Sequence, residues 1–141
     1  MTSLVLNKQY LEKNNFHQIG EYYLINNELK RNYKKYTNEL LSKERKLVYA
    51  FIVDDLVMYI GKTKQGFKRP LSYHTDYNNN KKTRGVHKGI REVISKSKIE
   101  VFARVFKHEI KVENIEIKIN PYVGYEEALI NNFTFKWNKQ K

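Results

Sequence analysis

Two short apolar segments flank a pair of aspartates, and they constrain the fold more than any other feature of the sequence. Residues 47–53 read LVYAFIV and residues 56–60 read LVMYI, both rich in the β-branched and aromatic side chains that favour strands. Asp54 and Asp55 between them suit a tight turn, so the sequence predicts an antiparallel hairpin. Neighbouring strand residues point to opposite faces, which makes a metal site on the two aspartates the weaker interpretation.

A basic segment precedes this hairpin. Over residues 29–41, apolar side chains recur at helical spacing and cationic ones lie largely on other faces. The apolar set is Leu29, Tyr33, Tyr36, Leu40 and Leu41, and the cationic set is Lys30, Arg31, Lys34 and Lys35. The pattern predicts an amphipathic helix, which either packs on the domain, the favoured interpretation, or lies along a phosphate backbone.

The second half of the chain alternates helix and strand patterns. An asparagine- and lysine-rich run at 78–82 predicts an exposed loop, and apolar spacing predicts a helix over 83–96. Residues 99–106 and 115–119 alternate as strands, and we expect them to form a second hairpin. Pro121 and Gly124 are expected to break the chain before a last helix over 125–133. The order predicts a small antiparallel α+β domain.

Composition limits the classes of function. Lys and Arg outnumber Asp and Glu by 27 to 15, and the resulting net charge of +12 favours a polyanionic partner such as nucleic acid. The sequence has no cysteine, which excludes disulfides and thiol catalysis, and its four histidines lack the spacing of a zinc site. Without a membrane-length apolar run or a signal-peptide pattern, the expected location is the cytoplasm, with no membrane partner.

Phosphodiester hydrolysis needs a group that handles water, a cation for the phosphate and a carboxylate for a divalent metal. All three types are available, in Tyr49 and Tyr59 on the hairpin, Arg69 after it, and Glu126 in the last helix. Each has a plainer interpretation taken alone: a sheet aromatic with its hydroxyl at the rim, a solvated charge, or a carboxylate at a helix N-terminus.

The spacing of these residues resembles the GIY-YIG nuclease family, and in particular its small phage endonuclease II and restriction-type members. The first motif appears as Leu47-Val48-Tyr49 and the second as Tyr59-Ile60-Gly61, followed by Lys62 and by Arg69 eight positions after the glycine. Glu126 and Asn138, the latter in Trp137-Asn138, match the closing helix and the terminal asparagine of the family. The resemblance covers about residues 47–138.

The resemblance implies a three-stranded sheet flanked by helices with an extra hairpin strand, and it implies roles for individual residues. Glu126 would bind Mg²⁺, for which Mn²⁺ can substitute, and Arg69 would contact the scissile phosphate. Tyr49, supported by Tyr59, would accept a proton from the attacking water or position it, with Lys62 and the metal favouring its phenolate. The histidine usual after the arginine is Tyr73 here, so Tyr73, His74, Arg84 and Lys88 all remain open for proton transfer. Gly61, Lys62, Lys64, Arg84, Lys88 and Asn138 are candidate DNA-binding residues.

These features predict a nuclease domain over 47–141 and an N-terminal helical extension over 1–46, acting as a DNA arm or in oligomerisation. The expected function is Mg²⁺-dependent hydrolysis of double-stranded DNA by a homodimer or larger homo-oligomer, in a bacterial or phage-infected cell. The alternative is a basic nucleic-acid-binding protein that keeps the scaffold without the catalysis. The presence of both Arg69 and Glu126 favours the enzyme.

Overall fold

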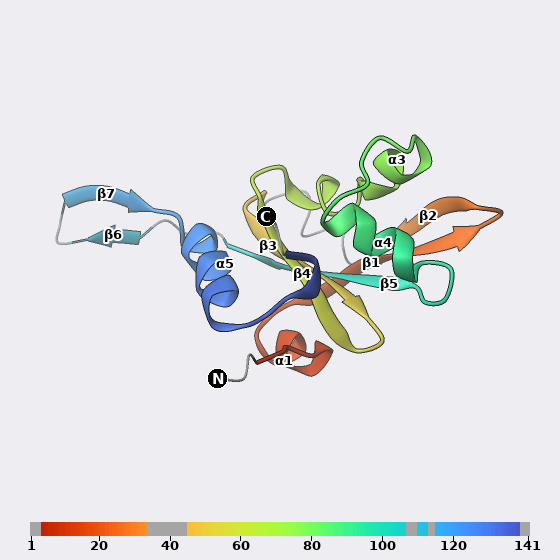
Figure 1. Cartoon of the computed structure of the whole chain (residues 1–141). Coiled ribbons are helices and arrows are strands. Elements are labelled where there is room, and N and C mark those ends of the chain that lie inside the picture. Colours follow the sequence, from red (N-terminus) through yellow and green to blue (C-terminus); the bar gives the residue numbers. More distant parts are fainter. Residues whose placement is uncertain (1–3, 34–44, 107–109, 113–114, 139–141) are drawn as a thin grey trace.

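A five-stranded antiparallel sheet forms the centre of the molecule (Figure 1). The structure is a computed structural model that describes residues 4–33, 45–106, 110–112 and 115–138. The strands are β1 (His17–Ile25), β2 (Glu28–Tyr33), β3 (Leu47–Val53), β4 (Leu56–Thr63) and β5 (Ile99–Val105), in the order β2-β1-β5-β3-β4. A separate two-stranded sheet, β6 (Ile110–Val112) with β7 (Ile115–Ile119), extends away from it (Figure 1). The antiparallel α+β class is confirmed, although the described central sheet has five strands and not three.

Short helices surround the sheet. They are α1 (Lys8–Lys13), α3 (Tyr73–Asn78), α4 (Val86–Val93) and α5 (Pro121–Asn132), with two 3₁₀ turns, η1 (Gly66–Lys68) and η2 (Lys136–Asn138). Helix α4 confirms the helix predicted after the asparagine-rich loop, and residues 79–85 of that loop are exposed. Among the described residues, no helix combines the length and the apolar character needed to cross a membrane.

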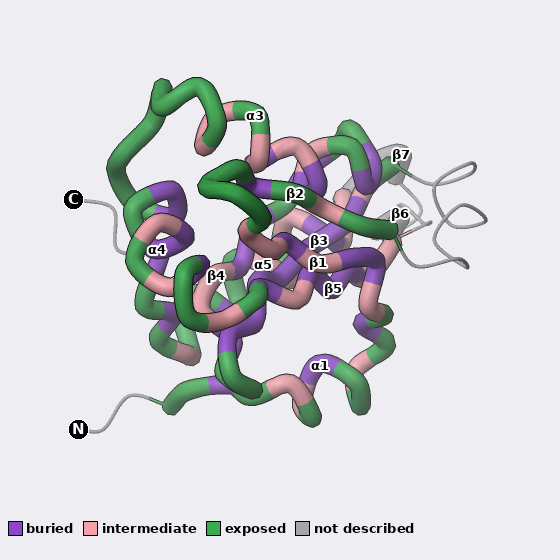
Figure 2. Tube along the Cα trace, turned by 90° about the vertical axis from the view of Figure 1, so that its right-hand side faces the viewer, coloured by how far each residue is buried: buried purple, intermediate pink, exposed green. Residues whose placement is uncertain are grey.

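The two faces of the sheet bury two separate cores. The face we call the tyrosine face carries Tyr49, Phe51 and Val101 and packs under η1, α3 and α4. The opposite face, here the α5 face, carries Val48, Ala50 and other apolar residues and packs against α1 and α5. Every residue of β3 is buried, since this strand has a covered face on each side (Figure 2). The predicted β3–β4 hairpin, with Asp54 and Asp55 in its turn, is confirmed.

The helix predicted over 29–41 is wrong where the structure describes it. Residues 29–33 lie in β2, which pairs with β1 through a turn at Asn26 and Asn27, and residues 34–44 are outside the described part of the chain. In β2 the buried Leu29 and the half-buried Arg31 alternate with exposed Lys30 and Asn32, which is the period of two expected of a strand. The N-terminal segment thus contributes two strands to the central sheet, while its role as a DNA arm or in oligomerisation stays a prediction.

The C-terminal part also departs from expectation in two places. The predicted pairing of 99–106 with 115–119 is wrong, because β5 lies between β1 and β3 and pairs with both. One face of β5 carries Ile99, Val101 and Ala103, all buried, and on the other face the buried Phe102 lies between half-buried Glu100 and Arg104. The expected break at Pro121 and Gly124 is wrong too, because α5 begins at Pro121 and continues through Gly124. Proline is tolerated in the first helical turn, where its missing N–H has no helical partner.

Candidate active site

Three tyrosines meet on the tyrosine face. The hydroxyls of Tyr49 in β3 and Tyr73 at the start of α3 lie 2.7 Å apart and share a buried hydrogen bond. The ring of Tyr59 in β4 lies 6.0 Å from that of Tyr49, centroid to centroid, and its phenol interacts with both other phenols. Phe51 packs edge-on against Tyr73 beneath them, with centroids 5.0 Å apart. The strand pairing of β3 with β4 and the start of α3 therefore bring residues 24 positions apart into one polar cluster.

Gly61 makes room for this cluster. It pairs with Tyr49 across the hairpin, and a Cβ atom on Gly61 would lie 2.6 Å from Cζ and 2.7 Å from the hydroxyl of Tyr49. Any side chain at this position would displace the phenol. The glycine of the second motif is thus required by the close approach of an aromatic ring, and its φ lies outside the positive region.

Arg69 joins the cluster from the turn that follows β4. Its guanidinium carbon lies 4.5 Å from the ring centroid of Tyr73, a cation–π arrangement, and the residue is half-buried. Among the described residues, the Arg69 side chain has neither an ion pair nor a hydrogen bond. A partly desolvated cation of this kind has donors available for an anion.

The three phenols are held in their neutral form. Burial raises the pKa of Tyr49, Tyr59 and Tyr73 above the usual value, and the charge of Arg69 opposes this rise without overcoming it. The cation that opposes the rise for Tyr49 is Arg69, and Lys62 pairs with Glu126, so the expectation that Lys62 and a metal favour a Tyr49 phenolate stays a prediction. At neutral pH the cluster therefore offers O–H donors.

Glu126 belongs to α5 and contacts the edge strand β4 through Lys62. One carboxylate oxygen is 3.2 Å from Nζ of Lys62, and the glutamate side chain is 14% exposed against 41% for the lysine. No hydrogen bond or ion pair joins Glu126 to Arg69 or to the three tyrosines among the described residues. The tyrosine cluster and Glu126 are connected through consecutive residues of β4, because Gly61 contacts Tyr49 and Lys62 binds Glu126. Glu127, the neighbouring carboxylate, is exposed.

The other predicted residues occupy different surroundings. Asn138 uses its side-chain amide to pair with both backbone groups of Ile60, at 2.9 Å each, and so satisfies one residue on the open side of the edge strand. His74 packs beside Tyr22 and interacts with the cations of β2, away from the three phenols. Lys64, Arg84 and Lys88 are exposed.

His87 belongs to the cluster although sequence reasoning did not select it. Its ring stacks on Tyr73 with centroids 5.1 Å apart, and burial lowers its pKa, so the imidazole is neutral at neutral pH. It also lines a cavity of about 290 Å³ together with Lys81, Lys82, Thr83 and Arg84. The available signal was its position three residues before Ile90 and seven before Ile94, in register with the buried stripe of α4.

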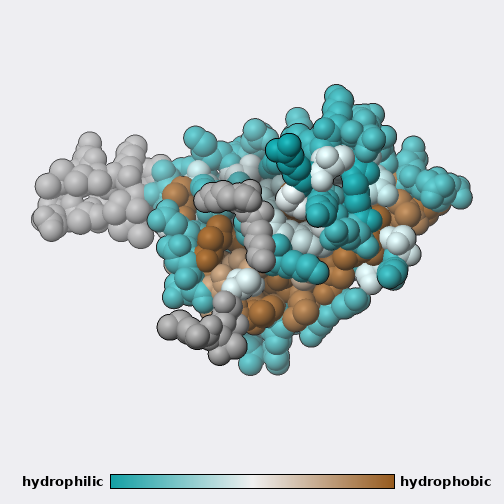
Figure 3. All heavy atoms as spheres, in the orientation of Figure 1, coloured by the Kyte–Doolittle hydropathy of each residue, from teal (hydrophilic) through white to brown (hydrophobic). Residues whose placement is uncertain are grey.

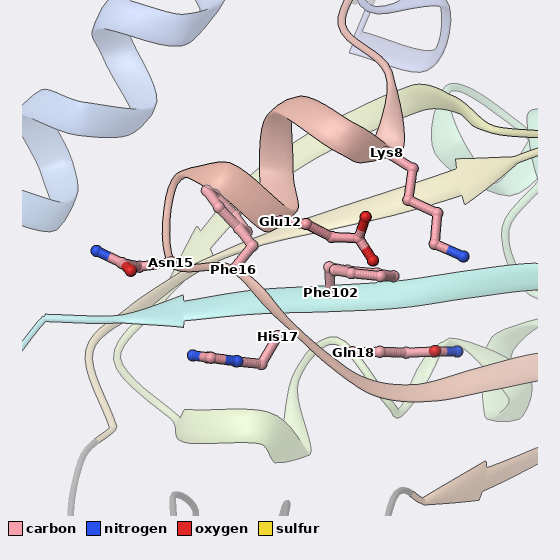
Figure 4. A pocket seen from close by; sticks show the side chains of 7 residues that line it. All are labelled: Lys8, Glu12, Asn15, Phe16, His17, Gln18 and Phe102. Carbon is pink, nitrogen blue, oxygen red and sulfur yellow. The ribbon is translucent and has the colours of Figure 1, made fainter.

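A second cavity, of about 340 Å³, lies between α1 and strands β1 and β5 (Figure 4). Lys8, Glu12, Asn15, Phe16, His17, Gln18 and Phe102 line it, and none of them belongs to the tyrosine cluster. The surface also differs across the molecule: hydrophilic residues cover the region of α3 and α4, whereas hydrophobic ones gather on the lower part of the same view (Figure 3). The cationic cavity of Lys81, Lys82 and Arg84 adjoins the cluster through His87.

Comparison with solved structures finds endonucleases among the matching chains. The chain is similar to a mutant of bacteriophage T4 EndoII, a GIY-YIG endonuclease, with a TM-score of 0.65 and 26% identity over 94% of this chain and 98% of that one. It is also similar in fold to the restriction endonuclease HPY188I in complex with product DNA, with a TM-score of 0.51 and 16% identity over 96% of this chain and 84% of that one. No protein-family model matches the sequence, and no curated protein sequence matches it. The resemblance to phage and restriction-type GIY-YIG nucleases is confirmed.

Proposed function

From this resemblance, we propose that the chain is a metal-dependent DNA endonuclease that hydrolyses phosphodiester bonds in double-stranded DNA, of phage or restriction type. The observation that carries the proposal is Arg69, a half-buried cation beside three neutral phenols, with no ion pair among the described residues. A guanidinium in this state binds a phosphate through two parallel N–H donors. Its attraction grows as negative charge develops on the phosphate during hydrolysis.

The phenol cluster would act by hydrogen bonding. Because burial keeps Tyr49 and Tyr59 protonated, we assign them to holding a phosphate oxygen or the attacking water, and not to proton abstraction. The neutral imidazole of His87 joins Tyr73, His74, Arg84 and Lys88 as a candidate for proton transfer. The ring of His87 stacks on Tyr73, a member of the cluster, whereas the ring of His74 packs beside Tyr22.

Glu126 is the residue that would hold Mg²⁺, or Mn²⁺ in its place. Its side chain is largely shielded, one oxygen binds Lys62, and the other has no hydrogen-bond partner among the described residues. Mg²⁺ is commonly bound by one or two carboxylates and keeps several waters, whereas a protein zinc site needs more ligands. No group of three or more His, Asp or Glu suited to a metal occurs among the described residues. The single carboxylate therefore fits Mg²⁺, which would stabilise negative charge on the phosphate when bound.

The cationic surface next to the cluster is the proposed path of the DNA. Lys64, Arg84 and Lys88 are exposed, and Arg84 lines the same cavity as His87. Exposed lysines and arginines along a groove neutralise successive phosphates. We further propose a homodimer or larger assembly in the bacterial or phage-infected cytoplasm, because two sites related by symmetry can cut both strands of a duplex.

Incubation with supercoiled plasmid tests this function. We expect nicked or linear DNA with Mg²⁺, none with EDTA, and about 10³-fold slower cleavage for Arg69→Ala, the size of effect that a charge-stabilising group has on turnover. Lys68→Ala, an exposed cation one residue earlier, is the matched control and should cut normally. If wild-type protein binds DNA but leaves the plasmid intact with both Mg²⁺ and Mn²⁺, the non-catalytic binding protein is the correct function.

A further inference from the structure

Tyr22 lies on β1, the strand that precedes the matched motifs, and its ring packs edge-on against Phe51 beneath the tyrosine cluster. Its side chain is fully buried. The hydroxyl donates a hydrogen bond to the carbonyl oxygen of Pro70 at 2.6 Å and accepts one from the backbone N–H of Tyr73 at 3.0 Å. The Tyr22 hydroxyl thus holds the backbone at Pro70, the residue after Arg69, and at Tyr73.

These two hydrogen bonds satisfy groups that would otherwise be unpaired. Tyr73 is the first residue of α3, where the N–H has no helical partner, and Ser72 makes no side-chain cap. Tyr22 supplies the missing acceptor from another strand. Because a buried polar group without a partner is costly, the segment between η1 and α3 depends on this hydroxyl for its conformation.

The rest of the β1–β2 hairpin holds the same segment. Arg31 in β2 donates from Nη1 to the carbonyl oxygen of Leu71 at 2.6 Å. At the far end of α3, the side-chain amide of Asn78 pairs with both backbone groups of Leu29, at 2.8 and 3.0 Å. Hydrogen bonds from Tyr22, Arg31 and Leu29 therefore join the hairpin to the stretch from Pro70 to Asn78.

We propose that the β1–β2 hairpin is a positioning element for Arg69 and Tyr73, and that Tyr22 is its central positioning residue. The proposal rests on the nuclease function proposed above, since it assigns to Tyr22 the orientation of groups that act on the phosphate. Tyr22 touches no reacting atom. It acts by fixing the backbone on both sides of the segment that carries the guanidinium and the phenol.

The test compares Tyr22→Phe with Tyr23→Phe. The first keeps the ring that packs on Phe51 and removes both hydrogen bonds, whereas the hydroxyl of Tyr23 makes no hydrogen bond to the described residues. We expect the single-turnover cleavage rate of Tyr22→Phe to fall by about tenfold or more, with DNA affinity within about twofold of wild type. Tyr23→Phe should match wild type in both. An unchanged rate for Tyr22→Phe, or equal losses of rate and affinity, overturns the proposal.

A double-variant cycle shows whether Tyr22 acts through Arg69. If it does, adding Tyr22→Phe to Arg69→Ala produces little further loss of rate, whereas independent effects multiply. Multiplying effects in this cycle and in the same cycle with Tyr73→Phe overturn the proposal. Should Tyr22→Phe fail to fold, Arg31→Met removes the bond to Leu71 from a partly exposed position and undergoes the same cycle.

Amide hydrogen exchange separates this inference from the proposed function. The Tyr73 N–H should exchange faster in Tyr22→Phe than in wild type, whether or not the protein cuts DNA. In Tyr23→Phe its exchange rate should equal that of wild type. Unchanged exchange at Tyr73 overturns the positioning role. Faster exchange in a protein that never cleaves supports the hairpin contact and rejects only the nuclease activity.

Discussion

The two hairpins of the central sheet, β1–β2 and β3–β4, have the same type of turn but differ in how far their strands are buried. Both turns have two residues with positive φ, 52° and 64° at Asn26 and Asn27, and 48° and 75° at Asp54 and Asp55, as type I′ hairpins require. Yet β3 is buried along its whole length, whereas β2 buries only Leu29. Identical turn geometry therefore serves both the strand at the core of the sheet and the strand at its edge.

The contrast indicates a division of labour. The β3–β4 hairpin is fixed by apolar packing on two faces, and it carries Tyr49, Tyr59 and Gly61 of the cluster. The β1–β2 hairpin contacts the same site through directed hydrogen bonds from Tyr22 and Arg31. Packing tolerates small adjustments of shape, but a hydrogen bond specifies the position of one atom relative to another.

The largest expected effect concerns the carboxylate that β4 holds through Lys62. Glu126→Gln keeps the side-chain shape and removes the anionic ligand, so Mg²⁺-dependent cleavage should be abolished while DNA binding is retained or tightened. Glu127→Gln, at the exposed neighbouring position, should cut nearly as wild type. Plasmid cleavage and a binding titration on both variants measure the difference.

The reverse outcome would be informative. If Glu127→Gln is inactive and Glu126→Gln cuts normally, the register of the closing helix is wrong by one residue. The interpretation of Glu126 as a carboxylate at the helix start is wrong, because α5 begins at Pro121 and its first turn has no acidic residue. A Glu126 that only pairs with Lys62 would leave turnover normal in both variants.

A glycine in each hairpin permits a direct comparison of the two. A Cβ at Gly61 would meet the Tyr49 ring at 2.6 Å, and a Cβ at Gly20 would meet the backbone oxygen of Asn32 at 2.2 Å. Both Gly→Ala changes should lower the free energy of unfolding by about 1 to 3 kcal/mol, the range for overpacking. Cleavage should fall further for Gly61→Ala, because that change moves the phenol itself. Urea unfolding and cleavage rates test this, and a greater cleavage defect in Gly20→Ala would reverse the proposed division of labour.

The sequence predicted the β3–β4 hairpin correctly but not the β1–β2 hairpin. The apolar run of β3 and the Asp54-Asp55 turn specify a buried hairpin from local residues alone. In β2, three polar residues at 30–32 separate Leu29 from Tyr33 on a strand that has one neighbour, and the spacing of Leu29 and Tyr33 also fits a helical face. Only the pairing with β1 decides between the two, and pairing is a long-range property.

The candidate site divides in the same manner. Tyr49, Tyr59, Arg69 and Tyr73 stand in a recognisable pattern of spacing, and the structure brings them together. Tyr22 stands outside that pattern, because its partners are backbone atoms 48 and 51 residues away. Residues that position a site from a distant strand leave no local pattern in a single sequence.

Two histidines provide a smaller test of the contrast, through pH. Burial lowers the pKa of His87, stacked on Tyr73, and of His74, beside Tyr22, below the usual 6.5. A depressed histidine pKa means that the unfolded chain binds the proton more readily, so stability is complete above pH 6.5 and declines as the pH falls below it. Melting temperatures measured from pH 8 to pH 5 should show this decline. His87→Gln should flatten the decline more than His74→Gln, since His87 is the more buried ring, and equal slopes in both variants would contradict that ranking.

The smallest expected effect distinguishes positioning from DNA binding at the two hairpins. Lys30 in β2 is exposed, and its Nζ forms an ion pair with Oε1 of Glu28 at 2.5 Å. Lys64 is an exposed cation directly after β4. If β1–β2 only positions the site, Lys30→Gln should leave the salt dependence of DNA binding unchanged. Lys64→Gln should reduce the slope of log affinity against log salt by about 0.9, the value for one phosphate contact on duplex DNA. Titrations between low and moderate salt measure both slopes. A reduced slope for Lys30→Gln would make the edge hairpin a DNA arm as well as a positioning element, and an unchanged slope for Lys64→Gln would move the DNA path away from the end of β4.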